Sequence, residues 1–236
     1  MTTQNQDSGT RLQRLSEKYG DLTTIRVLLQ AIPYVGGSLD TLLTDSGEKF
    51  RRDRTEKLLE YLADKISTLE GKVSIADIEN NEQLYDLMMQ AIQQSAKTRS
   101  EDKRRRFASI LRNQFESNEV WDEPEAALRL VSDLNDLHVQ ILRAAVEAPV
   151  CDEPFSNLSV ICLERSDSER HKTGVPPTDI SSLFPKIKQS TLQFHCAELM
   201  AKGLLKDEGT GRFDTGALVF FAATETANWL FDWLSD

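Results

Sequence analysis

Cysteine is scarce in this chain, and its distribution argues against a disulfide-stabilised secreted protein. The 236 residues include three cysteines, Cys151, Cys162 and Cys196. An odd number of thiols cannot all pair within one chain, and no charged and then apolar leader stands at the Met1 end. We therefore expect reduced cysteines and a cytoplasmic protein.

Long apolar runs are also missing. The most apolar stretch, residues 27–43, is interrupted by Gln30, Pro33 and Asp40, whereas a helix that spans a bilayer needs about 20 consecutive apolar residues. Two interpretations remain: a buried turn in a helical core, or a latent membrane-active hairpin with two glycines at its tip and a basic segment, residues 49–54, beside it. The candidate hairpin residues are Ile32, Val35, Gly36, Gly37, Leu39 and Leu42.

Signatures of catalysis and of cofactor binding are absent from the sequence. The glycine-rich segments YVGG and EGTGRFDTG lack the Lys-Ser/Thr ending of a phosphate-binding loop. His195 and Cys196 are adjacent, but the side chains of neighbouring residues on a helix point about 100° apart. A zinc motif requires paired ligands two to four residues apart. The sequence therefore predicts a protein that is not an enzyme, with no cofactor and no metal.

The composition is that of a folded globular protein with an uneven charge. Hydrophobic residues make up 39% of the chain and charged residues 28%, which argues against both a disordered chain and an integral membrane protein. The formal net charge is −10; residues 1–130 hold 19 Lys and Arg against 22 Asp and Glu, and residues 131–236 hold 9 against 16. The length suits two domains, of which the second is the more acidic.

The first half is predicted to be a helical bundle over residues 11–118, preceded by a polar, disordered tail at residues 1–10. Apolar residues recur at helical spacing in three segments, residues 47–70, 81–96 and 100–115. Each segment carries one apolar stripe that needs a partner helix, so we expect the three to pack together. The polar segment 118–124, which ends at a proline, is interpreted as the linker between the domains.

The second half, residues 125–236, follows the element order of a winged helix-turn-helix domain. The expected elements are a helix in residues 134–148, a strand in 158–163, a short helix in 176–185, a longer helix in 188–205, two strands in 204–223 and a closing helix in 224–234. A two-stranded wing after the longer helix is the feature typical of that plan. The predicted fold class is mainly α: an N-terminal helical bundle followed by an α+β winged-helix domain.

The charge of this second domain argues for a protein partner over nucleic acid. Duplex binding is driven by cations that displace counterions from phosphates, and about 6 to 10 such contacts serve an ordinary repressor. The acidic balance of residues 131–236 opposes this. A DNA-binding transcriptional regulator stays as an alternative, for which the cations would have to share one surface. The candidate nucleic-acid contacts are Lys186, Lys188, Lys202 and Arg212.

Aromatic residues near the C-terminus are the candidate protein interface. Trp229, Phe231 and Trp233 stand in a short acidic helix, and buried Trp and Phe side chains contribute much of the energy at protein interfaces. The simplest partner is a second copy of the chain, which would make a homo-oligomer. The alternative is that these rings pack on residues 219–221 of their own domain.

Two basic runs, RSEDKRRRF and EKFRRDRTEK, belong to the first half. Such runs can bind phosphates or anionic lipid headgroups. In the first run, however, Ser100 can cap a helix and Glu101 stands four residues before Arg105; in the second, Arg52 stands four before Glu56. Both runs are interpreted as solvated helix faces with internal ion pairs.

Three segments resemble a known bacterial family. LYDLMMQAIQQSA, RRRFASILRNQF and EPEAALRLVSDLNDLHVQIL, which lie within residues 84–142, are arranged as in the abortive-infection alpha family, where such helices precede a leucine, two polar residues and a leucine. No catalytic residue is carried over by this resemblance. It implies a non-enzymatic role in phage defence or stress response, exerted through protein contacts or conditional membrane contact.

Overall fold

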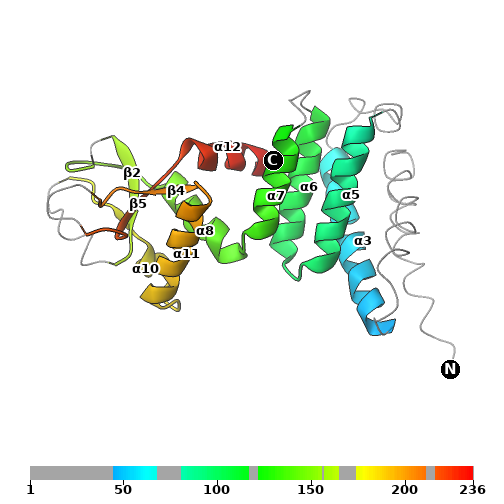
Figure 1. Cartoon of the computed structure of the whole chain (residues 1–236), viewed down its shortest axis with the longest axis horizontal. Helices are drawn as coiled ribbons and strands as arrows, with labels where there is room; N and C mark the ends of the chain where they lie inside the picture. Colours follow the sequence, from blue (N-terminus) through cyan, green and yellow to red (C-terminus); the bar gives the residue numbers. More distant parts are fainter. Residues whose placement is uncertain are drawn as a thin grey trace. The chain divides into compact units, whose positions relative to one another are not determined.

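The computed structural model describes residues 45–67, 81–116, 122–155, 157–164, 174–210 and 216–235. These residues form two compact units (Figure 1): the first contains residues up to Asp133 together with the last residues from Trp233, and the second is Leu134–Asp232. Each unit has its own core and is described by itself. The segment 27–43, with all of the candidate hairpin residues, lies outside the described residues.

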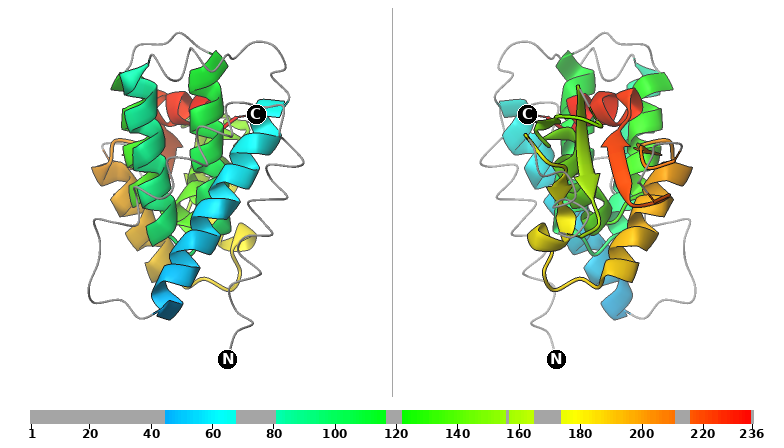
Figure 2. Two further views of the ribbon diagram at one scale, coloured as in Figure 1. Left: turned by 90° about the vertical axis from the view of Figure 1, so that its right-hand side faces the viewer. Right: turned by 90° about the vertical axis from the view of Figure 1, so that its left-hand side faces the viewer.

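The first unit is built from helices. They are α3 (Asp45–Ser67), α5 (Glu82–Lys97), α6 (Glu101–Glu116) and α7 (Asp122–Asp133). The second and third begin at polar caps: Asn81 Oδ1 accepts a hydrogen bond from Leu84 N at 3.0 Å, and Ser100 Oγ accepts one from Lys103 N at 2.9 Å. Helix α6 packs on the other three, and Figure 2 shows α3 running obliquely to its neighbours.

The core of this unit consists of the predicted apolar stripes. The residues expected on the inner face that prove buried are Leu59, Leu62 and Ile66 in α3, Leu84, Met88, Ala91 and Ile92 in α5, and Phe107, Ile110 and Leu111 in α6. Burying one such large side chain contributes roughly 1.5–3 kcal/mol. The bundle-like arrangement expected from helical spacing is therefore confirmed for these three segments.

The boundary between the units differs from the sequence-based expectation. Residues 118–124 had the composition of a linker, but α7 begins at Asp122 and packs on α5 and α6, so it belongs to the first unit. Pro124 is the third residue of α7 and is buried. Proline is tolerated in the first turn of a helix because the backbone N–H groups there have no intrahelical acceptor. The division between the units follows Asp133.

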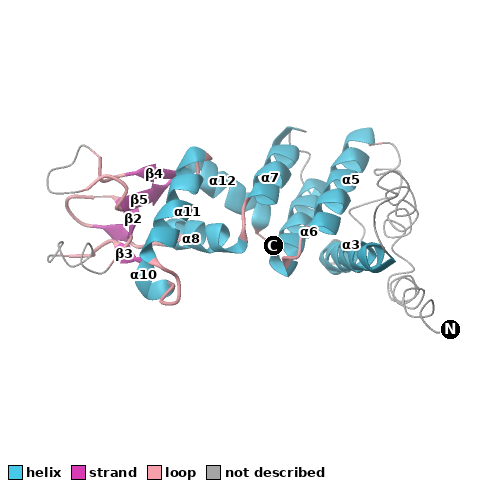
Figure 3. Ribbon diagram, turned by 60° about the horizontal axis from the view of Figure 1, so that its bottom comes forward, coloured by secondary structure: helices cyan, strands magenta, loops and turns pink. Residues whose placement is uncertain are grey.

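The second unit combines helices with a small sheet. Its helices are α8 (Asp136–Val146), α10 (Ile180–Leu183), α11 (Gln189–Ala201) and α12 (Glu225–Leu234), and its strands are β1 (Val150–Cys151), β2 (Leu158–Cys162), β3 (Thr178–Asp179), β4 (Leu205–Asp207) and β5 (Phe220–Ala223). The sheet order is β1-β2-β5-β4 with antiparallel neighbours, and β3 pairs with β2 in parallel. Figure 3 shows α8 and α11 beside this sheet.

The loop between β4 and β5 is organised by one carboxylate. Asp207 accepts hydrogen bonds from Gly209 N at 2.8 Å, Thr210 Oγ1 at 2.6 Å and Leu218 N at 3.0 Å. Gly209 permits the closure, because a Cβ atom there would lie 2.1 Å from the carbonyl oxygen of Gly216. The antiparallel pair predicted around a glycine-rich turn is thus confirmed.

The core of the second unit holds all three thiols of the sequence. Cys151 and Cys162 pack with Phe155 and Phe220, whose ring centroids lie 4.9 Å apart, and Cys196 is buried on α11. None of the three forms a disulfide, as expected. Burial raises the pKa of the Cys196 thiol to about 12.

Among the helices of the described residues, none has both the length and the apolarity that are needed to cross a bilayer.

Candidate functional site

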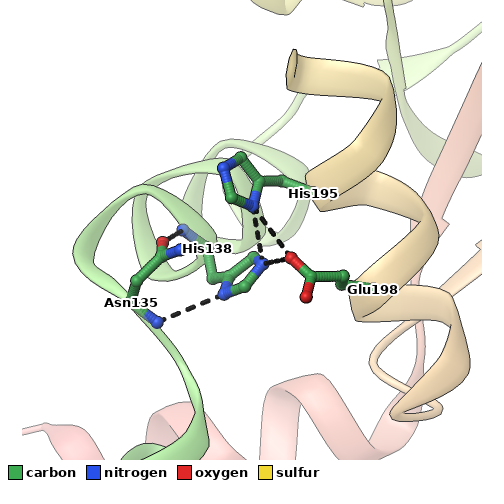
Figure 4. Close-up of polar contacts among 4 residues, drawn as sticks. All are labelled: Asn135, His138, His195 and Glu198. Carbon is green, nitrogen blue, oxygen red and sulfur yellow. Dashed lines mark hydrogen bonds and ion pairs between the residues drawn. The ribbon is translucent and has the colours of Figure 1, made fainter. Parts of the chain in front are cut away.

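The first turn of α8 fixes the orientation of a buried histidine. Asn135 is the N-cap, and its Oδ1 accepts a hydrogen bond from His138 N at 2.8 Å. In return, His138 Nδ1 accepts a hydrogen bond from Asn135 N at 3.2 Å, which completes a capping box. Because Nδ1 faces the start of its own helix, Nε2 on the other side of the ring points toward α11 (Figure 4).

Helix α11 supplies two further polar side chains at this point. His195 and Glu198 are three residues apart, so they lie on the same face of the helix. His138 Nε2 lies 2.8 Å from His195 Nδ1 and 2.8 Å from Glu198 Oε2, and His195 Nδ1 lies 3.1 Å from the same oxygen. The imidazole rings are nearly perpendicular, at 88°. We call these three residues the His-His-Glu cluster.

The positions of the protons in this cluster follow from the hydrogen bonds. Since His138 Nδ1 accepts from a backbone N–H, the neutral ring carries its proton on Nε2. That N–H can donate to Glu198 Oε2 or to His195 Nδ1, both at 2.8 Å. Two imidazole nitrogens at this separation cannot both present a proton to each other, so one lone pair faces the centre of the cluster.

The cluster lies at the rim of the contact between α8 and α11. The side chains of His138 and His195 are 4% and 13% exposed, whereas Glu198 is 38% exposed. Burial lowers the pKa of His138 and outweighs the hydrogen bond to Glu198, which acts to raise it. Burial acts to raise the pKa of Glu198, but the hydrogen bonds from the two histidines leave it lowered. At neutral pH a neutral imidazole therefore faces a carboxylate.

Two imidazole nitrogens and a carboxylate oxygen are a donor set for a divalent transition metal. The three ligand atoms all lie within 4.8 Å of one another. The sequence predicts no metal at this point, because His195 and Cys196 are adjacent and a zinc motif has paired ligands two to four residues apart. The spacing of His195 and Glu198 was the available local signal, while His138 stands 57 residues earlier than His195 and reaches it only through packing.

Comparison with known proteins assigns no family to the chain. No protein-family model matches it, and no curated protein and no solved structure matches it significantly. The resemblance to the abortive-infection alpha family therefore stays a prediction. The functional argument rests on the geometry of the described residues.

Two of the candidate nucleic-acid contacts lie at opposite ends of α11. Lys188 is the N-cap of α11 and Lys202 is its C-cap, so the 13 residues of the helix separate them, about 20 Å at 1.5 Å per residue. Lys186 is exposed just before the helix, and Arg212 lies outside the described residues. In the hairpin of β4 and β5, Lys206 Nζ pairs with Glu208 Oε1 at 2.6 Å.

The exposed face of α11 consists of uncharged residues, Ser190, Gln193, Phe194, Ala197 and Ala201. Glu198 borders this face, with 38% of its side chain exposed. Phe194 is 59% exposed, although it is one of the largest apolar side chains. The ring of Phe194 also lies edge-on to that of His195, with centroids 5.5 Å apart. A helix that would read DNA in a winged-helix protein thus presents a neutral, partly apolar surface.

The aromatic residues of α12 are more enclosed than an interface anchor would be. Trp233 is 6% exposed, and its carbonyl oxygen accepts a hydrogen bond from Asn113 Nδ2 at 3.0 Å. Trp229 and Phe231 are half-buried, and the Arg143 guanidinium lies 5.9 Å from the centroid of the Phe231 ring. Of the aromatic residues considered, Phe194 on α11 offers more surface to a partner.

The basic run of α6 is divided among separate partners. Arg104 is buried and donates to Thr98 O at 3.1 Å, and Lys103 Nζ donates to Ser132 O at 2.8 Å. Arg105 pairs with Glu101 at 3.0 Å, as the helical spacing predicted, and its guanidinium lies 4.3 Å from the centroid of the Tyr61 ring. Because Arg104 points inward, the run is neither a continuous anion-binding patch nor a wholly solvated face.

Proposed function

We propose that this chain acts by binding protein, with the exposed face of α11 as the contact surface, and that it does so in phage defence or a related stress response. The composition of this surface supports the proposal. The surface consists of uncharged residues on an otherwise acidic domain, and it exposes Phe194. Large aromatic side chains are frequent energetic centres of protein interfaces.

The arrangement of the second unit supports a winged-helix interpretation. A winged helix has three helices followed by a two-stranded wing, and a strand before the wing completes its sheet. Here α8, α10 and α11 precede β4 and β5, and β2 joins them in the order β2-β5-β4. In this interpretation, α11 corresponds to the recognition helix, and its surface is the expected place for a binding function.

Electrostatics favours a protein over duplex DNA on this surface. Between Lys188 and Lys202, α11 contains no lysine or arginine. Salt-dependent binding to phosphates needs several cations along the contact, and one at each end of a helix of about 20 Å does not supply them. DNA binding remains the alternative function and is tested below.

The partner that we propose is a second copy of the chain. Residues 131–236 have a net charge of −7, so two copies repel each other except where they meet through uncharged surface. The face of α11 provides such a surface. Ala197 and Ala201 allow close approach of a second helix, and a two-fold axis would place the Phe194 ring of each copy against these small residues of the other.

Sedimentation over a range of protein concentrations tests this proposal. We expect a reversible dimer. Phe194→Ser should raise the dissociation constant of the dimer by about tenfold or more. The matched control is Phe50→Ser on α3, because Phe50 is exposed to the same 59% but lies in the first unit. A wild-type chain that stays monomeric, or equal effects of the two substitutions, would contradict the proposal.

A second arm of the experiment addresses DNA. Binding to random-sequence duplex is measured at several salt concentrations, with Lys186→Gln and Lys188→Gln as variants. The proposal predicts no binding at physiological salt. Tight binding that falls steeply with salt and weakens in both variants would favour the regulator instead.

A further inference from the structure

We propose that the His-His-Glu cluster binds one divalent first-row transition-metal ion, with zinc as the representative case. The ligand atoms are His138 Nε2, His195 Nδ1 and Glu198 Oε2, which already converge in Figure 4. This site is independent of the proposed contact surface. Its three side chains point into the contact between α8 and α11, whereas Phe194 points outward.

The distances in the cluster are close to those that an ion requires. Zinc bound tetrahedrally at about 2.0–2.1 Å holds its ligand atoms about 3.3 Å apart. The observed separations are 2.8, 2.8 and 3.1 Å. Spreading the three atoms by a few tenths of an ångström therefore suffices, and rotation of the Glu198 side chain, which is 38% exposed, can supply much of it.

The chemistry of the donors selects the class of ion. Two imidazoles and one carboxylate suit zinc, cobalt, nickel and ferrous iron, whereas calcium and magnesium prefer oxygen ligands alone. Three protein ligands leave a fourth position open. The carboxylate is the most exposed of the three side chains, so water can occupy the open position from that side.

Ion binding has a structural consequence at the start of α8. A neutral imidazole that binds metal through Nε2 must carry its proton on Nδ1. In the structure, Nδ1 accepts the 3.2 Å hydrogen bond from Asn135 N. The proton therefore moves from Nε2 to Nδ1, and this half of the capping box is lost, while the 2.8 Å bond from His138 N to Asn135 Oδ1 can remain.

Cobalt titration of the full chain, after removal of metal with a chelator, tests the site. We expect one Co²⁺ per chain, visible d–d absorption bands, and displacement by Zn²⁺. Glu198→Gln and His195→Gln should each weaken binding by about tenfold or more. The control is His171→Gln, since His171 is the third histidine of the sequence and lies outside the described residues. His138 is left unchanged because its burial ties it to folding.

Absence of stoichiometric cobalt binding would overturn the proposal. Binding that is lost with His171→Gln but retained with His195→Gln would overturn it as well. In wild-type protein, the ¹⁵N shifts of the His138 ring report which nitrogen is protonated. The proposal predicts a change from Nε2–H to Nδ1–H on addition of Zn²⁺, and a ring that keeps its proton on Nε2 in the zinc-bound state is not a ligand.

Two substitutions of the N-cap test the linkage to the capping box. Asn135→Ala removes the side-chain cap and keeps the backbone N–H, whereas Asn135→Pro removes both, and the φ of −87° at this residue is compatible with proline. The proline variant should bind Zn²⁺ between about 2-fold and 10-fold more tightly than the alanine variant, which corresponds to one hydrogen bond. Equal affinities in the two variants would overturn the linkage.

Discussion

Two helix pairs, one in each unit, bury different kinds of side chain. In α3 and α6, most of the buried side chains are apolar, among them Leu62, Phe107 and Ile110, although Glu56 and Arg104 are buried as well. Between α8 and α11, buried Leu192 and Cys196 share the contact with His138, an imidazole that is almost fully covered. Apolar groups need only complementary shape, but a buried imidazole needs directed partners at both ring nitrogens. The second pair is therefore the better place to look for a specific site.

Removing the largest side chain from the apolar pair should have the largest effect. Phe107→Ala leaves a cavity in the first unit, and we expect a loss of about 3–5 kcal/mol in the free energy of unfolding. Hydrogen exchange read by mass spectrometry separates the units: α3, α5 and α6 should lose protection while residues 134–232 keep theirs. Phe50→Ala, at an exposed position on α3, should change stability by less than about 0.5 kcal/mol. Equal loss in both units would mean that they do not unfold separately.

Arg104 is a polar exception in the first unit and offers a smaller test. Arg104→Met preserves much of the apolar stem but removes the donor to Thr98 O, so we expect a loss of about 1–3 kcal/mol. Urea denaturation followed by circular dichroism measures it. The neighbouring Arg105→Met breaks an exposed ion pair and removes the contact of the guanidinium with the Tyr61 ring, and it should cost less than about 1 kcal/mol. An equal loss of stability in the two variants would show that the hydrogen bond from Arg104 contributes no more than the exposed ion pair.

The smallest expected effect is the pH dependence of the loop between β4 and β5. Burial acts to raise the pKa of Asp207, but the hydrogen bonds from Thr210, Leu218 and Gly209 leave it lowered. A carboxyl with a lowered pKa in the folded state contributes stability above its unfolded pKa of about 3.9, and this is lost as pH falls through the folded value. Protection of β4 and β5 from hydrogen exchange should fall below pH 4.

Asp207→Asn should abolish that acid-dependent loss, at a cost on the order of 1 kcal/mol at neutral pH. Asp86→Asn, at an exposed position on α5, serves as the control and should leave the acid profile unchanged. If the Asp207→Asn variant keeps the wild-type pH profile, the carboxylate does not organise the loop.

Much of the fold follows from local patterns in the sequence. Apolar spacing located α3, α5 and α6, because the side chains of a helix that face the core recur with a fixed period. Two strand-like segments around a glycine-rich turn located β4 and β5. Pro124 misled the prediction of the boundary, since a proline can end a linker or stand in the first turn of a helix. Only the packing of α7 on α6 distinguishes these cases.

The His-His-Glu cluster was not predictable in the same way. His138 stands in an amphipathic helix, and Glu198 is one of many acids in an acidic domain, so neither residue is marked as a ligand by its local sequence. Nothing periodic links positions that are 57 residues apart, and the contact between α8 and α11 that joins them is tertiary. The sequence also did not indicate that Phe194 is exposed, because an apolar residue in an amphipathic helix is expected to face the core.

The three native thiols can report how often the second unit opens. All three belong to the second unit and each is at most 2% exposed. A thiol reagent in solution can modify them only while that unit is open, so the rate of labelling of unmodified protein measures the frequency of that opening. Within the described part of the first unit there is no competing thiol. A single cysteine introduced at an exposed position on α5 would therefore accept a fluorophore quickly, before the native cysteines react.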